Sequence, residues 1–246
     1  ARVVGFSLPE LPTTPSHFEA LGLAERLSPA ADLRSDVRSL DSLLETISDT
    51  RPDYIFHLAA QPLVRLSFEE PLPTFETTAL GSVNLLEAVR RADHGCTVIM
   101  ITTDKVYENA EWQYAYRECD PLGGVDPYSA SKACAEIMIA SYRRAFFEST
   151  LGDLGRRPIA VASVRGGNVV GGGDWSADRL VPDVARAWSG NENVTIRRPQ
   201  ATRPWQHVLE PLSGYLWLAA RLALLVIRRP AALQTVLDCL LSYMQV

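Results

Sequence analysis

Closely spaced cysteines are missing from this chain. Cys96, Cys119, Cys134 and Cys239 are widely separated, so their spacing supports neither a zinc motif nor a dense disulfide framework. We therefore predict no metal site. We also predict a protein of the reducing cytoplasm, because the sequence indicates no structural disulfides.

An excess of positive charge is missing as well. The sequence has 24 Lys and Arg against 29 Asp and Glu, which gives a formal net charge of -5. A general nucleic-acid binder usually shows the opposite balance, because it must neutralise phosphates. We predict no nucleic-acid partner.

The sequence also lacks a long uncharged apolar run and a recognisable targeting segment. The longest apolar stretch, residues 215–227, is interrupted by Arg221 and is shorter than the ~18 residues typical of a membrane span. The first residues contain neither an initiator Met nor a basic-then-apolar signal segment. These absences predict a soluble protein with no membrane partner, and we expect the chain to be a segment of a longer polypeptide.

What is present fits a folded α/β protein. The 246 residues are 47% apolar and 22% charged, which argues against disorder and against a fibrous architecture. Short β-rich runs alternate with helical patterns, the former at 2–6, 54–58, 97–102 and 159–164, the latter at 39–48, 74–91, 127–147, 178–188 and 211–222. The alternation and the continuous apolar character of the strands predict a doubly wound parallel sheet with helices on both faces. Beyond Val164 the sequence is richer in Gly, Pro and Trp, which predicts loops over the carboxyl edge of the sheet rather than another regular unit.

The segment that begins at Asp126 carries the first candidate site. Asp126 and Pro127 are a helix-start signal, and Tyr128 and Lys132 lie four residues apart, on one face of the helix that follows. A nearby positive charge favours the phenolate form of tyrosine, which would then serve as a base near neutral pH. Taken alone, the same spacing is compatible with an ordinary amphipathic helix.

A second candidate site follows the apolar strand at 97–102. Thr103, Asp104 and Lys105 place a hydroxyl, a carboxyl and an ammonium group at the carboxyl end of that strand, the edge at which parallel α/β folds bind ligands. The threonine can hold a substrate hydroxyl, and Asp104 and Lys105 can divide acid and base work between them. The alternative is a polar turn in which Asp104 is a cap. Two such sites on successive crossover units favour function.

Five segments of the sequence are distinctive: HLAAQPLVR at 57–65, TDKVYEN at 103–109, YSASK at 128–132, GNVVGGGDW at 167–175 and RPWQHV at 203–208. Together they resemble the extended short-chain dehydrogenase/reductase superfamily and, within it, the CDP-glucose 4,6-dehydratases, over about Val3 to Leu222. The Tyr-x-x-x-Lys and Leu-Ala-Ala motifs identify only the superfamily. The Asp-Lys pair, Gly-Gly-Gly-Asp-Trp and Arg-Pro-Trp-Gln-His are more specific, since dTDP-sugar dehydratases typically carry Asp-Glu at the acid/base pair.

The resemblance implies a Rossmann-like NAD-binding fold and an NAD cofactor. Asp36 matches the acidic residue that meets adenine. Leu58, Ala59 and Ala60 match the strand end that lines the NAD pocket. Lys132 matches a residue that touches the nicotinamide ribose, and the resemblance also implies that Tyr128 contacts the cofactor.

The resemblance also implies a lyase reaction on CDP-glucose. Thr103, Tyr128 and Lys132 match the set that oxidises the sugar at C4. Asp104 and Lys105 match the pair that eliminates water across C5 and C6, with Lys105 taking the C5 proton and Asp104 protonating the departing hydroxyl, although these two roles could be exchanged. The hydride then returns to C6, which gives CDP-4-keto-6-deoxyglucose.

Arginines and an asparagine in the second part of the chain match contacts to the sugar nucleotide. Asn168, Arg179 and Arg203 are implied there, because guanidinium forks suit a diphosphate. The alternative to a binding role is a solvent-exposed basic loop. We favour this alternative for Arg198, and we favour it least for Arg203. The resemblance leaves a homo-oligomer open.

The sequence departs from the family at both ends and at one inner position. The sequence does not contain the family's first strand and Gly-rich turn, which bring helix amides to the NAD pyrophosphate. We therefore expect a sheet without its first strand and weak NAD binding. Beyond Leu222 the resemblance stops. We therefore expect an incomplete NAD-binding core at 1–164 and a partial sugar-nucleotide lobe at 165–246 with a divergent tail after 222. The asparagine usual in the helix after the 54–58 strand is Thr78 here, which we expect to alter a contact beneath the site.

Two alternatives to the implied reaction remain open. One is an epimerase or a dehydratase that uses another nucleotide sugar, because the Tyr-Lys machinery is shared. The other is a catalytically silent fragment that only folds or associates with a partner. Bound NAD in the purified protein would count against the second.

Overall fold

The computed structural model describes residues 1–148 and 158–228, which form two compact units. The smaller unit comprises Ala1–Asp36 and Gly167–Val208, and the larger unit comprises Val37–Gly166 and the helix that begins at Leu209. This division reflects how the residues pack. The predicted division at residue 164 instead separates an NAD-binding part from a sugar-nucleotide-binding part, and it stays a prediction.

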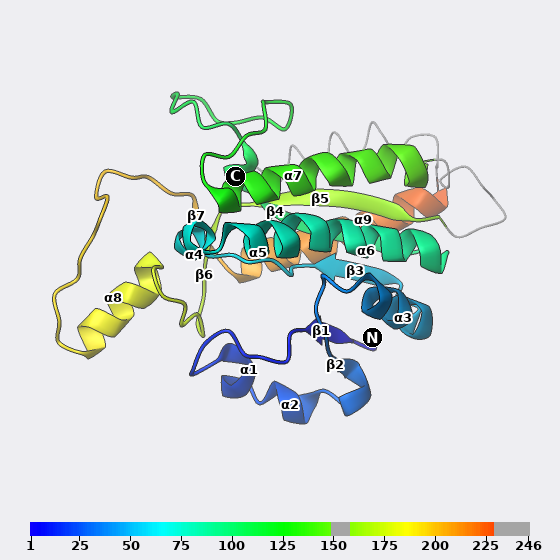
Figure 1. Ribbon diagram of the computed structural model, residues 1–246, viewed down its shortest axis with the longest axis horizontal. Helices are drawn as coiled ribbons and strands as arrows, with labels where there is room; N and C mark the ends of the chain where they lie inside the picture. Colours follow the sequence, from blue (N-terminus) through cyan, green and yellow to red (C-terminus); the bar gives the residue numbers. More distant parts are fainter. Residues whose placement is uncertain (149–157, 229–246) are drawn as a thin grey trace. The chain divides into compact units, whose positions relative to one another are not determined.

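The larger unit is built on a parallel sheet of three strands. Strands β3 (Tyr54–His57), β4 (Thr97–Thr103) and β5 (Ala160–Gly166) pair in the order β3-β4-β5, and they lie side by side in Figure 1. In this register Ile99 stands opposite Phe56 on one side and Ala162 on the other. The strands predicted at 54–58, 97–102 and 159–164 are therefore confirmed, each to within two residues at either end.

Helices cover both faces of this sheet. The larger unit contains α3 (Leu40–Thr50), α4 (Val64–Glu69), α5 (Pro71–Phe75), α6 (Gly81–Ala92), α7 (Pro127–Tyr142) and α9 (Leu209–Arg228). Ile99, Ala162 and Val164 pack against α9 in a buried cluster, whereas Thr102 and Ser163, of opposite parity along the strands, contact α7. Figure 1 shows α6 and α7 over one face and α9 over the other.

Two π-helical segments adjoin these helices. Glu76–Leu80 joins α5 to α6, and Arg143–Phe147 follows α7. Gly81 lies directly after the first segment, where an added Cβ would approach a Val37 methyl to 2.8 Å. The absence of a side chain at Gly81 therefore allows α6 to pack closely on the segment before α3.

The start of α7 is defined by capping and by a close backbone approach. Asp126 caps the helix by accepting a hydrogen bond from the Ser129 amide at 2.9 Å, and Pro127 occupies the first turn. Gly124 packs directly on this turn, since an added Cβ would lie 2.2 Å from the Ala130 nitrogen. The predicted helix start at Asp126 and Pro127 is confirmed.

The smaller unit contains two short parallel strand pairs. Strand β1 (Gly5–Ser7) pairs with β2 (Asp32–Arg34), and β6 (Asn168–Val170) pairs with β7 (Trp205–His207). Its helices are α1 (His17–Ala20), α2 (Leu23–Arg26) and α8 (Leu180–Ser189), with a 3-10 turn at Pro29–Ala31. The expectation that no further regular unit follows Val164 is wrong, because β6 and β7 form a parallel pair. Strands of three residues are too short to show a period in the sequence.

The predicted fold class is confirmed, although the described strands form three sheets rather than one. All four strand pairings in residues 1–148 and 158–228 are parallel. In the same ranges, no helix is both long and apolar enough to cross a membrane, and no His, Cys, Asp and Glu side chains cluster in a way that could hold a metal ion. Cys239 and most of the tail predicted to diverge after residue 222 lie outside the described residues.

Candidate active site

The carboxyl end of β4 carries a linked set of polar side chains. Thr103, the last residue of the strand, is buried, and its hydroxyl donates a hydrogen bond to Asp104 at 3.0 Å. Asp104 and Lys105, in the 3-10 turn Asp104–Val106, form an ion pair at 3.2 Å with each side chain about one-third exposed. This arrangement places a hydroxyl, a proton donor and a proton acceptor within one turn of chain.

Helix α7 brings a lysine to the same strand. The Lys132 ammonium is buried and donates a hydrogen bond from Nζ to the carbonyl oxygen of Ile101 at 3.1 Å, two residues before Thr103. Tyr128 lies one turn earlier on the same face of α7. Its backbone amide donates to the fully buried hydroxyl of Ser67 at 3.1 Å, so α4 fixes the first turn of α7.

Burial alters the charge states of two groups in this region. Burial lowers the pKa of Lys132 from 10.5 to about 8, and the charge of Glu136 opposes that change. Burial, together with the positive charge of Lys132, lowers the pKa of His57 from 6.5 to about 3. The His57 imidazole is therefore neutral at pH 7, and its Nε2 forms a hydrogen bond with the Ser82 hydroxyl at 3.0 Å. The end of β3 and Lys132 of α7 are thus electrostatically coupled.

The loop after β3 holds the predicted cofactor-side residues. Leu58, Ala59 and Ala60 directly follow the last strand residue, His57. The next residue, Gln61, donates from its backbone amide to the Thr78 hydroxyl at 3.3 Å and from its side chain to the Thr74 hydroxyl at 3.0 Å. Thr78, where an altered contact was expected, is 1% exposed and supports this loop from the π-helical segment.

The remaining predicted site residues belong to the smaller unit. Asp36 follows β2 by two residues. Asn168 opens β6 opposite Trp205 of β7, and the exposed Arg203 precedes β7 by two residues. Arg179, the N-cap residue of α8, forms an ion pair with Asp174 at 3.3 Å.

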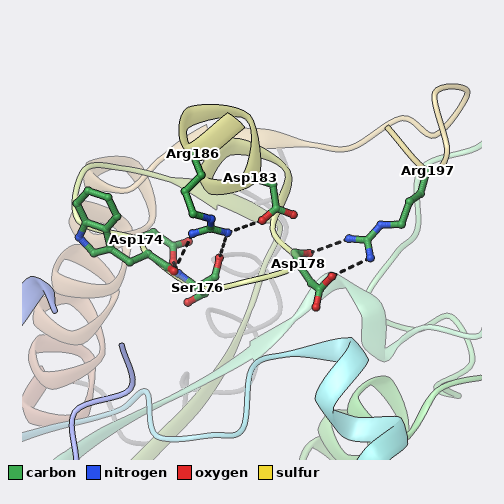
Figure 2. Close-up of polar contacts among 7 residues, drawn as sticks. Asp174, Ser176, Asp178, Asp183, Arg186 and Arg197 are labelled. Carbon is green, nitrogen blue, oxygen red and sulfur yellow. Dashed lines mark hydrogen bonds and ion pairs between the residues drawn. The ribbon is translucent and has the colours of Figure 1, made fainter. Parts of the chain in front are cut away.

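Two further arginines of the smaller unit hold the loop before α8. Arg186 donates to the carbonyl oxygens of Trp175 and Ser176 at 2.9 and 3.2 Å and also pairs with Asp183. Arg197 pairs with Asp178, whose backbone adopts a positive φ of 61°, at 2.8 Å. Figure 2 shows these contacts converging on the 174–178 loop. The Gly-Gly-Gly-Asp-Trp motif ends in this loop, at Trp175. The hydrogen bond from Arg186 to the Trp175 carbonyl therefore fixes the end of the motif to α8.

The structure thus brings the β4 triplet, Lys132 and the loop after β3 together within the larger unit. One cavity of that unit, about 930 Å³, lies beside the second half of α7 and is lined by residues such as Glu118, Glu136 and Arg165, not by Thr103 or Tyr128. The joint role that the resemblance implies for Thr103, Tyr128 and Lys132 therefore stays a prediction.

Sequence reasoning missed several residues that position this site. Ser67 accepts a hydrogen bond from the first turn of α7, and Ser82 pairs with His57. The buried Glu136 of α7 forms an ion pair at 3.0 Å with the partly buried Arg165 of β5. Glu136 carried one usable signal, because it is a carboxylate four residues after Lys132 on a helix face that is otherwise apolar or small.

Known proteins similar to this chain are sugar-nucleotide enzymes. A family model described as GDP-mannose 4,6-dehydratase matches residues 23–219. The CDP-glucose 4,6-dehydratase of Salmonella typhimurium is 46% identical over 222 residues, which cover 90% of this chain and 60% of the relative. A dTDP-glucose 4,6-dehydratase of Mycobacterium tuberculosis is 31% identical over 135 residues, which cover 52% of this chain and 40% of the relative. The chain therefore spans about three-fifths, or less, of the length of these relatives.

Solved structures of similar fold share less sequence. A dTDP-glucose 4,6-dehydratase of Streptomyces venezuelae, solved with NAD and TYD bound, has a TM-score of 0.73 at 23% identity and covers 91% of this chain and 63% of its own. The UDP-glucuronic acid 4-epimerase of Bacillus cereus, solved with UDP-glucuronic acid and NAD, has a TM-score of 0.72 at 22% identity, covering 87% and 64%. At such identity these structures support the α/β fold alone, while the sequence matches confirm the resemblance to the 4,6-dehydratases.

Proposed function

The chain belongs to the GDP-mannose 4,6-dehydratase family, and from this premise we propose that it catalyses the NAD-dependent dehydration of CDP-glucose to CDP-4-keto-6-deoxyglucose. The observation that carries the proposal is the Thr103, Asp104 and Lys105 triplet at the end of β4 beside the buried Lys132 of α7. Within the family resemblance, an Asp-Lys pair at this point favours CDP-glucose over dTDP-sugars, and the 46% identity to a CDP-glucose 4,6-dehydratase supports the same choice.

The larger unit fits the nicotinamide end of NAD. Lys132 uses one of its three N–H donors on the Ile101 carbonyl, which leaves donors suited to ribose hydroxyls. Leu58, 56% exposed at the end of β3, offers an apolar surface for a flat ring. NAD, when bound, supplies a hydride acceptor for the sugar C4 and a hydride donor for C6. In the smaller unit, Asp36 after β2 would meet the adenine end.

Tyr128, Thr103 and Lys132 would act at the sugar C4. Tyr128 removes the proton of the C4 hydroxyl, and Thr103 orients that hydroxyl by a hydrogen bond. Lys132 keeps positive charge one turn from Tyr128, which favours the phenolate form of the phenol. The half-buried position of Tyr128 suits a base that must reach substrate while bulk water is limited.

Asp104 and Lys105 would carry out the elimination. A proton first passes from the Lys105 ammonium to the Asp104 carboxylate across their 3.2 Å contact. The Lys105 amine then takes the proton from C5, which the ketone at C4 makes acidic, and the Asp104 carboxylic acid gives its proton to the departing C6 hydroxyl, which returns the pair to its charged form. Their ion pair at 3.2 Å keeps both groups at one end of the strand, so a proton taken on one side can be balanced by a proton given on the other.

Residues 165–246 would contribute the sugar-nucleotide contacts, and residues 1–164 the NAD contacts. Asn168, Arg179 and Arg203 are the residues proposed to bind the nucleotide diphosphate, since guanidinium groups bind such oxygens bidentately. Asp174, which pairs with Arg179, would orient that guanidinium. The proposed compartment is the cytoplasm, on the grounds of the scattered cysteines.

The test is incubation of the purified chain with NAD and, separately, CDP-glucose, dTDP-glucose, UDP-glucose and GDP-mannose. Loss of one water from CDP-glucose, followed by mass spectrometry and abolished in Tyr128→Phe, is the expected result. Loss of water from another sugar nucleotide would replace the proposed substrate, and a change of sugar configuration without loss of water would identify an epimerase. A folded chain that neither binds NAD nor turns over any of the four would support the silent fragment.

A further inference from the structure

A carboxylate lies one helical turn behind the Tyr128 and Lys132 pair. Tyr128, Lys132 and Glu136 follow at four-residue spacing along α7, which places them on one face of the helix. Glu136 is only 5% exposed. A carboxylate held away from water is costly unless it is paired and hydrogen-bonded.

Three donors on two neighbouring strands satisfy this carboxylate. Thr102 of β4 donates a hydrogen bond to its Oε1. Ser163 and Arg165 of β5 donate to its Oε2 at 3.1 and 3.0 Å. Because β4 and β5 are hydrogen-bonded to each other along this stretch, the donors fix the carboxylate with respect to the sheet.

The same part of β4 holds the Lys132 ammonium. Its Nζ donates to the carbonyl oxygen of Ile101, and Ile101 is the residue directly before Thr102. Burial lowers the pKa of Lys132 to about 8, and Glu136 acts in the opposite direction. Glu136 is thus the charge that favours the ammonium form of this buried lysine.

Other charged and titratable groups near the pair do not replace this charge. His57 of β3 is neutral at pH 7 because its pKa is about 3. Tyr107 lies under the Arg165 guanidinium at 4.8 Å, and burial raises its pKa, so its phenol is neutral too. Arg165 is positive and is balanced by Glu136 itself.

We propose that Glu136 is a positioning residue of the candidate active site: fixed by Thr102, Ser163 and Arg165, it keeps the Lys132 ammonium charged against the end of β4. The Lys132 ammonium in turn favours the phenolate form of Tyr128, and this consequence rests on the proposed function. The effect of Glu136 on Lys132 is independent of the proposed function.

The test uses the fact that the chain has only two lysines, Lys105 and Lys132. In the full chain labelled with ¹³C-lysine, the two side-chain signals are followed by NMR from pH 6 to 11 and assigned with Lys105→Arg. In Glu136→Gln, which keeps the size of the side chain and removes its charge, the Lys132 midpoint is expected to fall by about one pH unit. The Lys105 midpoint serves as an internal control and stays in place.

A second pair of variants separates charge from structure. Arg165→Met removes the opposing charge and should move the Lys132 midpoint upward, whereas Ser163→Ala removes one hydrogen bond, leaves every charge, and should leave the midpoint in place. Opposite shifts are not expected from loosened packing alone. If Glu136→Gln fails to fold, the sign of the Arg165→Met shift decides.

Lys132 midpoints that are the same in wild type, Glu136→Gln and Arg165→Met would overturn the inference. An inactive chain that shows the two opposite shifts would refute the proposed function and leave this inference standing. An active dehydratase that shows no shift of the Lys132 midpoint would support the proposed function and refute this inference.

Discussion

At the scale of single residues, two lysines with different exposure lie near the end of β4. Lys105 is one-third exposed and paired with Asp104, where it can exchange protons with a substrate. Lys132 is buried against the Ile101 carbonyl, where it can hold charge but has little access to solvent. In the proposed reaction, the two lysines therefore suit different steps.

Lys105→Ala tests the first of these roles. If Lys105 takes the C5 proton, oxidation at C4 should survive in the variant while elimination slows by ~10²–10⁴-fold, the usual contribution of a positioned acid or base. Exchange of the C5 hydrogen with deuterated solvent reports the step. Wild-type exchange in Lys105→Ala would remove the residue from this role and would transfer it to Asp104.

His57 predicts an acid sensitivity of the larger unit. The unfolded imidazole binds a proton below about pH 6.5, whereas the folded one resists protonation down to about pH 3 because it is buried near Lys132. Between these values the unfolded state binds more protons, so stability falls as the pH is lowered through this window. We expect a loss of about 3 kcal/mol between pH 6.5 and 4 from this group.

The measurement is urea unfolding of wild type and His57→Gln across that range. Glutamine retains a polar partner for Ser82 but does not titrate, so the variant should lose less stability on acidification, by the amount assigned to His57. Parallel pH dependences of the two proteins would show that the folded imidazole is not held neutral.

At the scale of elements, the site depends on where α7 begins. The first turn is set by the Asp126 cap, by the Ser67 hydroxyl on the Tyr128 amide and by the bare backbone of Gly124. These contacts come from the preceding loop and from α4, so the positions of Tyr128 and Lys132 depend on two other parts of the chain.

Gly124→Ala should disrupt this arrangement. The new Cβ would lie 2.2 Å from the Ala130 nitrogen and 2.3 Å from the Ser129 carbonyl carbon, and backbone atoms inside a helix cannot yield. We expect a loss of about 3 kcal/mol in the free energy of unfolding, the upper end of the usual cost of overpacking, measured by urea titration. Gly123→Ala is the matched control, since its new Cβ would meet Glu108 at 3.4 Å. Equal stability of the two variants would show that Gly124 does not constrain the turn.

The elements differ in how far the sequence could predict them. The continuous apolar run Val98–Ile101 and the Asp126-Pro127 start signal are local, and β4 and α7 were predicted from them. Strands β2, β6 and β7 have three residues each, too few for a period, and their existence depends on the neighbour each one pairs with. Glu136 could not be placed because its partners Thr102, Ser163 and Arg165 come from strands distant in sequence.

At the scale of the whole molecule, the two units bury very different amounts of apolar surface. Among the described residues of the smaller unit, the buried ones are Ser16, Ala31 and Pro182. The larger unit contains the clusters around Ile99 and Val106. Because apolar burial is the main favourable contribution to folding, we expect the free energy of local opening to be small in the smaller unit.

Hydrogen exchange followed by mass spectrometry should reveal this difference. Amides of β1, β2, β6 and β7 should exchange at least about 100-fold faster than those of β4, because local opening exposes the former and only global unfolding exposes the latter. Comparable protection in all five strands would mean that the chain opens as one cooperative body.

The lysine content has a practical side for anyone who handles this protein. Arginine supplies all but two of the 24 basic side chains, so reagents that attack amines find, apart from the chain's first residue, only Lys105 and Lys132. Amine-coupled sensor surfaces, aldehyde cross-linkers and succinimidyl dyes would attach at the end of β4, Lys105 first because it is the more exposed. Immobilisation through an engineered terminal tag would leave the site open, whereas coupling through side-chain amines would tether the molecule by the lysines of the candidate active site.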